Sequence, residues 1–344
     1  MLAARFYAPG EPLRVEEVPM PAAGPGQVLV RVTACGICGS DMHFIEGRAP
    51  VAATPITLGH EPAGVVVETG AGVADIAPGQ RVVVRPGAGC GRCSACASGR
   101  DSLCERTRVL GMHVDGGLAE YLAADGSSII PVPDGVPLEQ AAIISDAVAT
   151  PYHALVERGA LRAGESVAVF GCGGLGAHAV QLARLAGAAT VIAVDVRASA
   201  LDRARRAGAD IAINAAEERP SRRIRELVGG VDLALECVGR ADTIGEAVKS
   251  LRRGGRAVVV GMGPDAIQLP PPNVFTWSEH ALIGSFGSSA EHVRRLLGMA
   301  ASGRLDLSAS VTAVLPLHDV NAGLDMLRAP GGDAGRVVVQ PGRE

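Results

Sequence analysis

The stretch SVAVFGCGGLGAHAVQLARLAG, residues 166–187, decides the fold of this 344-residue chain. Its first five residues are strand-like and mostly apolar, and its second half has the length and apolar spacing of a helix. Between the two lies Gly171-x-Gly173-x-x-Gly176, which permits a tight turn, close approach of a ligand to the backbone, and close packing of helix on strand. A second apolar run, TVIAVD, ends in Asp195, 19 residues after the last glycine. This order predicts a βαβ unit that binds a dinucleotide.

The glycine turn should hold the pyrophosphate of that dinucleotide, because a helix N-terminus offers free N–H groups and a partial positive charge. Gly174 lies in the same turn and joins the predicted cofactor-binding residues. The Asp195 carboxylate should bind a ribose 2′-hydroxyl and repel a 2′-phosphate, which favours NAD over NADP. Arg197 lies two residues on and could attract that phosphate. A glycine-rich turn without a ligand is the alternative.

The pattern of apolar residues changes near the middle of the chain. Residues 27–124 show short alternating runs broken by Gly and Pro, which predicts an antiparallel, β-rich domain. After residue 150, strand-length apolar runs alternate with helical stretches, which predicts a doubly wound parallel sheet of the Rossmann type. We therefore expect a discontinuous β-rich catalytic domain, residues 1–150 and 286–344, with the dinucleotide-binding domain, residues 151–285, inserted into it.

Composition and charge exclude several classes of protein. The chain has 32 Lys and Arg against 36 Asp and Glu, a formal charge of −4, and no long basic run that could follow a nucleic acid. The N-terminus has no apolar signal sequence, so we expect a cytoplasmic protein. The apolar stretch at residues 167–183 approaches membrane length, but glycines break its middle. We expect neither nucleic acid nor membrane as a partner.

Four of the eight cysteines lie within residues 89–104, spaced Cys90-x2-Cys93-x2-Cys96-x7-Cys104. Four thiolates form a closed tetrahedral zinc site of the structural kind. A reducing compartment favours metal binding over disulfides for such a cluster. Free or disulfide-bonded cysteines, a nucleic-acid finger and an iron–sulfur site are the alternatives.

Two further stretches combine metal-ligating residue types with glycines: ACGICGSDMH, residues 34–43, and GHEPAGVVVETGAGV, residues 59–73. With them the whole chain resembles the zinc-dependent medium-chain alcohol dehydrogenases. The family pattern G-H-E-x2-G-x5-G-x2-V is met at Gly59, His60, Glu61, Gly64, Gly70 and Val73. The four-cysteine lobe and the glycine turn follow in the family's order, so the resemblance spans nearly the whole chain.

The resemblance implies a GroES-like catalytic domain and a catalytic zinc held by Cys38 and His60. Asp146 stands where several members have a further cysteine, as in members that act on secondary alcohols. Glu61 competes with Asp146 for the third ligand position, since a carboxylate beside His60 can turn toward the metal. A chelate of Cys35 and Cys38 is the rival arrangement.

The resemblance also assigns residues to proton transfer and to the cofactor. Ser40 and His43 match the family's proton relay, and the alternatives are a turn-capping serine and a surface histidine. Thr150 matches a residue beside the nicotinamide, and Arg336 one that reaches the pyrophosphate.

The implied function is that of an NAD-dependent enzyme with two zinc ions per chain, one catalytic and one structural. It would interconvert an alcohol, with a secondary alcohol favoured, and the corresponding ketone or aldehyde, as a homodimer or homotetramer. The stretch HALIGSF, residues 280–286, is a candidate interface strand. The alternatives are a non-catalytic zinc scaffold that binds dinucleotide, and a zinc-free enone or quinone reductase of the same superfamily.

Overall fold

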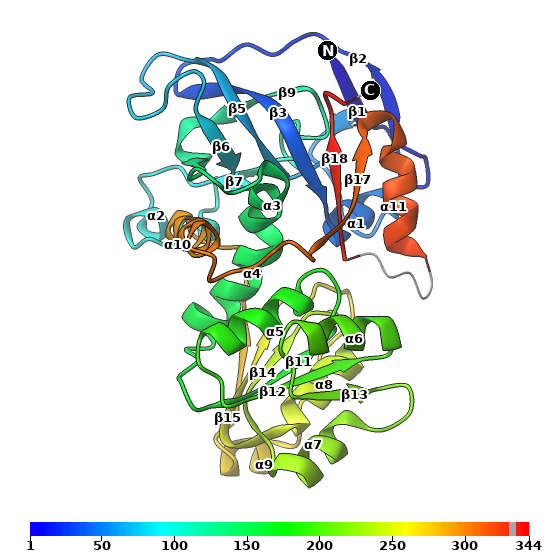
Figure 1. Ribbon diagram of the computed structural model, residues 1–344. Coiled ribbons are helices and arrows are strands. Elements are labelled where there is room, and N and C mark those ends of the chain that lie inside the picture. The colour runs from blue at the N-terminus through cyan, green and yellow to red at the C-terminus, as the bar shows by residue number, and fades with distance from the viewer. Residues whose placement is uncertain (330–334, 344) are drawn as a thin grey trace. The chain divides into compact units, whose positions relative to one another are not determined.

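A computed structural model describes residues 1–329 and 335–343. The chain forms two compact units (Figure 1): the first comprises Met1–Ala149 and Ser288–Glu344, and the second Thr150–Gly287. Each unit has its own hydrophobic core. The first core includes Val30, Ile37, Leu58, Leu118 and Val337. The second includes Phe170, Ile192, Ile213, Ile224 and Val231.

The second unit is built on a six-stranded parallel sheet. Its strands, in spatial order, are β13 (Ile211–Asn214), β12 (Thr190–Asp195), β11 (Ser166–Phe170), β14 (Val231–Glu236), β15 (Leu251–Val259) and β16 (Ala281–Gly284). Its helices are α5 (Gly176–Leu185), α6 (Ala198–Arg206), α7 (Pro220–Val228), α8 (Ala241–Lys249) and α9 (Pro272–Trp277). The strand order reverses between β11 and β14, where α/β sheets of this type bind ligands at the carboxyl ends of their strands. The predicted Rossmann sheet is confirmed.

The first unit is built around the long strand β3, which pairs with β5 on one side and with β9 and β18 on the other. The seven strands of this sheet are β3 (Gln27–Ile37), β5 (Glu61–Thr69), β6 (Arg81–Val84), β9 (Tyr121–Asp125), β10 (Ile129–Pro131), β17 (Val311–Pro316) and β18 (Arg336–Gln340). The named strands within residues 27–124 pair antiparallel, as predicted for that stretch, whereas β17 and β18, which lie outside it, are parallel. Helix α11 (Val320–Arg328) connects them, and such a crossover returns the chain in the same direction.

Smaller elements complete the first unit. A three-stranded sheet consists of β1 (Leu2–Phe6), β2 (Arg14–Glu17) and β4 (Ile56–Thr57), and a two-stranded one of β7 (Gly87–Ala88) and β8 (Arg108–Val109). The helices are α1 (Gly39–Ile45), α2 (Ser94–Ala97), α3 (Leu138–Ile143) and α10 (Ala290–Ala301), with 3-10 turns at Asp101–Leu103, Gly126–Ser128 and Leu317–Asp319. A π-helical turn, Ile144–Val148, precedes α4 (Ala149–Tyr152), which spans the boundary between the units, and a second π-helical turn, His153–Arg158, belongs to the second unit.

No helix in the part of the chain that the structure describes is long and apolar enough to cross a membrane.

Candidate metal centres and cofactor-binding turn

The four-cysteine lobe brings its thiols together around one point. The sulfur atoms of Cys90, Cys93, Cys96 and Cys104 all lie within 4.8 Å of one another. Cys93 Sγ lies 3.5 Å from Cys96 Sγ, and the Cys90 N–H donates to Cys104 Sγ at 3.3 Å. All eight cysteines are free thiols, so the disulfide alternative is not met.

The lobe favours thiolates at two of its positions. Backbone N–H groups of Cys90 and Arg106 lower the pKa of Cys104 to about 6, and the pKa of Cys90 is lowered in the same way. Burial and the neighbouring Cys93 raise the pKa of Cys96 to about 11. A divalent cation among the four sulfurs would favour deprotonation of all of them, so this donor set fits a structural zinc ion.

One arginine fastens the lobe to the rest of the first unit. The Arg85 side chain is only 4 % exposed. Its Nη1 donates to Asp101 Oδ2 at 2.7 Å, and its Nη2 donates to the Ser288 carbonyl at 3.0 Å. No motif marks Arg85, and its one signal in the sequence is a charged side chain at the end of the apolar run RVVVRP.

The second metal cluster gathers residues from three separate parts of the chain. Cys38 caps the N-terminus of α1, and Asp146 lies in the π-helical turn. Glu61 is the first residue of β5, and His60 directly precedes it. One ligand atom of each residue lies within 4.8 Å of the others. The extra residue of a π-turn redirects the side chains that follow, and such turns are frequent at functional sites.

Asp146 lies beside both Cys38 and His60. Its Oδ2 is 3.5 Å from His60 Nε2 and 3.7 Å from Cys38 Sγ. Cys35 lies outside the cluster, with its thiol 3.7 Å from the Gly36 carbonyl oxygen and its pKa raised by burial. The donor set is therefore built on Cys38 and His60 rather than on a Cys35–Cys38 chelate.

The charges of the cluster favour a cation. Burial acts to lower the pKa of His60, but Asp41 and Asp146 outweigh it and raise that pKa well above its ordinary value. Burial raises the pKa of Glu61 to about 7, Arg336 opposes the rise, and Asp146 adds to it. Glu61 Oε2 is buried and receives no hydrogen bond from the described residues. A thiol, an imidazole and two carboxyls with this excess of negative charge fit zinc.

Asp41 holds both Cys38 and His60 in place. Its Oδ2 accepts a hydrogen bond from the Cys38 N–H at 2.9 Å, and its Oδ1 lies 3.4 Å from His60 Nδ1. A carboxylate on the far nitrogen of a ligating imidazole fixes the tautomer and the ring orientation. His60 Nε2 is thereby the nitrogen turned toward Cys38 and Asp146.

Arg336 is buried at the start of β18, and its Nη2 donates to Glu61 Oε1. Its predicted contact with the cofactor pyrophosphate stays a prediction. The pairing with Glu61 was not predicted. Its only signal in the sequence is an arginine within the apolar stretch GRVVVQP.

Ser40 and His43 lie three residues apart on α1 and therefore on one face of it. Ser40 Oγ is 3.3 Å from His60 Nε2, so the hydroxyl lies at the metal cluster. His43 is half-buried, and burial followed by the charge of Arg48 lowers its pKa from the ordinary 6.5. At pH 7 the His43 ring is neutral and can accept a proton. The relay role of both residues stays a prediction.

The glycine turn of the second unit has the geometry of a cradle. Gly171 has φ +84°, and a Cβ on Gly176 would lie 1.8 Å from the Gly171 carbonyl oxygen. Around Gly173 the nearest atom to a built Cβ is Arg197 Nη2, at 3.6 Å. The turn fits a pyrophosphate because its middle is open at the N-terminus of α5.

Asp195 ends β12 beside this turn, and its Oδ2 accepts a hydrogen bond from the Cys172 N–H at 2.7 Å. Gly174 lies in the same turn, and Thr150 is buried in α4. The predicted contacts of Asp195 with ribose and of Thr150 with nicotinamide stay predictions.

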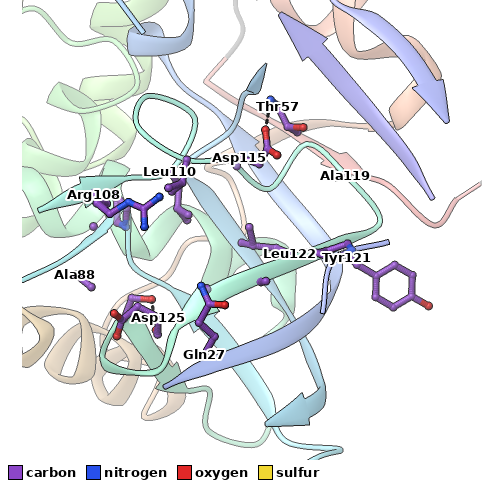
Figure 2. A pocket seen from close by; sticks show the side chains of 18 of the residues that line it. Gln27, Thr57, Ala88, Arg108, Leu110, Asp115, Ala119, Tyr121, Leu122 and Asp125 are labelled. Atoms are coloured by element: carbon purple, nitrogen blue, oxygen red, sulfur yellow. Dashed lines mark hydrogen bonds between the residues drawn. The ribbon is translucent and has the colours of Figure 1, made fainter. Parts of the chain in front are cut away.

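A cavity of about 550 Å³ lies elsewhere in the first unit, beside β7, β8 and β9 (Figure 2). Its lining includes Arg108, Leu110 and Leu122 but none of the residues of the Cys38 cluster. Asp115 at its rim accepts hydrogen bonds from the Thr57 N–H at 2.8 Å and from Arg5 Nη1 at 2.7 Å. The cavity is therefore distinct from the candidate catalytic centre.

Comparisons with known proteins agree with this geometry. Residues 24–134 match the family described as alcohol dehydrogenase GroES-like domain, and residues 174–302 match the one described as zinc-binding dehydrogenase.

Similar proteins cover nearly the whole chain. An alcohol dehydrogenase of Geobacillus stearothermophilus is 38% identical over 335 residues, 96% of each chain. An L-threonine 3-dehydrogenase of Bacillus licheniformis is 32% identical and covers 99% of each. The solved structure of alcohol dehydrogenase TADH from Thermus sp. ATN1 superimposes with a TM-score of 0.91 at 34% identity over 99% of each chain. The chain therefore belongs to the zinc-binding alcohol dehydrogenase family of the medium-chain dehydrogenases, the family that its sequence motifs resemble.

Proposed function

We propose that this protein is a zinc-dependent dehydrogenase that oxidises a secondary alcohol to a ketone with NAD. The alcohol carbon gives a hydride to the nicotinamide, and the hydroxyl gives a proton to the protein. The observation that carries the proposal is the Cys38, His60, Glu61 and Asp146 cluster with the Ser40 hydroxyl at its edge.

The protein's residues position and deprotonate the alcohol. When bound, zinc polarises the alcohol oxygen and lowers its pKa, and NAD accepts the hydride. Cys38, His60 and one of the two carboxylates would hold the metal, with Asp41 fixing the imidazole. Ser40 Oγ would take the proton from the alcohol oxygen and pass it toward His43, whose lowered pKa keeps its ring ready to accept.

The carboxylate of Asp146 supports a secondary alcohol as substrate. Asp146 Oδ2 lies beside both Cys38 and His60, whereas Glu61 Oε1 is engaged by Arg336. We therefore favour Asp146 as the third zinc ligand. The similar L-threonine 3-dehydrogenase is consistent with this substrate class, because the C3 hydroxyl of threonine is secondary.

Neither alternative function uses all of these features. A zinc-free enone or quinone reductase needs neither metal cluster, and both clusters are assembled here. A non-catalytic scaffold needs no hydroxyl at the edge of the Cys38 cluster, where Ser40 lies 3.3 Å from His60.

A substrate panel tests the proposal. Matched primary, secondary and polyhydroxy alcohols are offered with NAD to the zinc-loaded protein, and NADH absorbance is followed. Secondary alcohols should give the highest kcat/KM. A preference for primary alcohols would contradict the substrate class, and no turnover of any alcohol would contradict the function.

We also infer a homo-oligomer that associates through the edge strand β16. Among the strands that the structure describes, β16 pairs with β15 alone, and the exposed side chains of Trp277 and Phe286 lie nearby in sequence. Sedimentation velocity of the wild type and of Leu282→Arg tests this inference, because a charge on the edge strand should shift a dimer or tetramer toward smaller species.

A further inference from the structure

The cavity beside β7, β8 and β9 has an excess of positive charge in its lining (Figure 2). Its charged side chains are four arginines and two aspartates: Arg5, Arg85, Arg106, Arg108, Asp115 and Asp125. The whole chain, by contrast, has a formal charge of −4. A hollow surface with an excess of one charge concentrates ions of the opposite charge. Its volume of about 550 Å³ suits a small organic molecule.

Two of the four arginines are already paired within the protein. Arg5 Nη1 donates to Asp115 Oδ1 at 2.7 Å, so the rim aspartate has a cation of its own. Arg85 Nη1 donates to Asp101 Oδ2 at 2.7 Å, and the Arg85 side chain is buried. The charges of these two arginines are therefore largely compensated, and they serve to hold the walls of the cavity.

The other two arginines, Arg106 and Arg108, have uncompensated charges. Both side chains are exposed, and neither makes a hydrogen bond or an ion pair with any residue that the structure describes. The second aspartate of the lining does not pair with them, because Asp125 Oδ1 accepts from the Ser127 N–H at 2.9 Å and from the Ser127 hydroxyl at 2.7 Å. Two guanidinium groups are thus available to a ligand.

Buried apolar side chains form the inner wall of the same cavity. Leu110, Ala119 and Leu122 are all buried and all line it. Arg108 and Leu110 are alternate residues of an extended segment, so their side chains face the same side of the chain. The cavity therefore combines cationic groups that border solvent with an apolar wall behind them.

We propose that this cavity binds a small phosphate monoester with an apolar body. The phosphate pairs with the guanidinium groups of Arg106 and Arg108, and the apolar body packs against Leu110 and Leu122. A planar guanidinium binds two phosphate oxygens at once. A monoester phosphate has a charge of about −1.5 to −2 at pH 7, which matches two arginines better than a carboxylate does.

The site is separate from the proposed alcohol oxidation and adjoins the four-cysteine lobe. None of the Cys38 cluster lines the cavity, whereas Gly89 and Cys90 of the lobe do. A ligand that binds only the folded form of a protein stabilises that form by mass action. A phosphate monoester in this cavity should therefore stabilise the first unit without entering the catalytic centre.

Calorimetric titration with phenyl phosphate tests the inference. The protein is zinc-loaded and saturated with NAD, so that a dinucleotide already occupies the glycine turn. Phenyl phosphate should bind at one site per chain, and inorganic phosphate at least about tenfold more weakly, because it has no apolar surface to bury. Arg108→Met should weaken phenyl phosphate at least about tenfold, since it removes a charged hydrogen-bond donor.

Arg100→Met is the matched control, because Arg100 is an exposed arginine of the lobe that does not line the cavity. It should leave the affinity for phenyl phosphate unchanged. Saturating phenyl phosphate should also raise the Tm of the wild type and of Arg100→Met, but not that of Arg108→Met. The inference is wrong if phenyl phosphate does not bind, if inorganic phosphate binds as tightly, or if the two arginine variants have equal effects.

Discussion

The two metal clusters of the first unit are built in opposite ways. The four-cysteine lobe takes all of its ligands from 16 consecutive residues, and three of its four cysteines are half-buried. The Cys38 cluster takes its ligands from places up to 108 residues apart and mixes sulfur, nitrogen and oxygen. It is also surrounded by buried polar side chains that act on the ligands, such as Asp41 and Arg336.

The difference reflects what each metal is for. Four identical thiolates fill every coordination position of a tetrahedral ion, so the ion can stabilise the fold but cannot bind a substrate. A mixed set with at least one replaceable oxygen can keep one position for substrate, and it needs neighbours that set the charge and orientation of each ligand. Loss of one ligand should therefore affect stability at the first cluster and turnover at the second.

The largest effect is expected at the lobe. Cys90→Ser should release the structural zinc and destabilise the first unit, because structural zinc sites hold roughly 10–16 kcal/mol of apparent binding free energy in peptides. Metal analysis should find two zinc ions per chain in the wild type and one in the variant, with a lowered Tm by calorimetry. One zinc or none in freshly purified wild-type protein would contradict the assignment of two sites.

Cys38→Ser should remove nearly all turnover and leave the stability of the first unit nearly unchanged, the opposite of the effect of Cys90→Ser. Turnover should fall by more than about a hundredfold, the upper range for residues that merely orient metal ligands. The Tm of the lobe-containing unit should remain close to that of the wild type, because the four lobe cysteines are untouched. Assays of kcat/KM together with thermal unfolding measure both quantities, and a collapse of the Tm would mean that the two clusters are not separable.

Substitution of the two carboxyls of the Cys38 cluster, Asp146 and Glu61, distinguishes which of them is the third zinc ligand. Asp146→Asn should lower zinc content and turnover about 10–100-fold. Glu61→Gln should be milder in turnover per folded molecule, but it leaves the buried Arg336 without its anionic partner, at a cost of about 3–5 kcal/mol of stability. Zinc content, kcat/KM and urea unfolding are measured on both. Greater loss of turnover in Glu61→Gln would make Glu61 the third ligand.

The smallest effect concerns the proton path beside the cluster. The pKa of His43 is lowered from its ordinary 6.5, so the ring protonates, and alcohol oxidation slows, only as the pH falls below that value. His43→Gln should lower kcat/KM by about tenfold at neutral pH and remove the acidic limb of its pH profile. An unchanged limb in the variant would place the proton acceptor elsewhere.

The sequence could predict those features whose residues lie close together along the chain. The four-cysteine lobe and the glycine turn are each contained in about twenty residues, and spacing alone constrains which atoms can meet. The two-domain fold was predicted from the change in the spacing of apolar residues near residue 150. The parallel pairing of β17 and β18 was missed, because two short apolar runs carry no mark of their relative direction.

Contacts across long sequence separations could not be predicted from local residue patterns, and the meeting of Cys38 with Asp146 was expected only through the family resemblance. Arg336 and Glu61 are 275 residues apart, and Arg85 and the Ser288 carbonyl are 203 apart. Each contact involves a buried arginine at one end of an apolar strand, Arg85 directly after β6 and Arg336 at the start of β18. A buried charge of this kind signals that a partner exists but not which one. The position of Asp146 depends on a π-helical turn that no residue pattern announced.

The place of β18 in the sheet determines the order in which the two units can finish folding during synthesis. Domains generally fold in sequence as they leave the ribosome. Thr150–Gly287 is complete before Arg336 is made, whereas the last three residues of β3, from Cys35 to Ile37, have no β18 partner until then. A nascent chain thus has its dinucleotide unit finished while Glu61 still lacks the arginine that will neutralise it. The catalytic centre is among the last parts of the protein to mature, and ribosome-bound fragments that end before β18 should bind nucleotide but lack dehydrogenase activity.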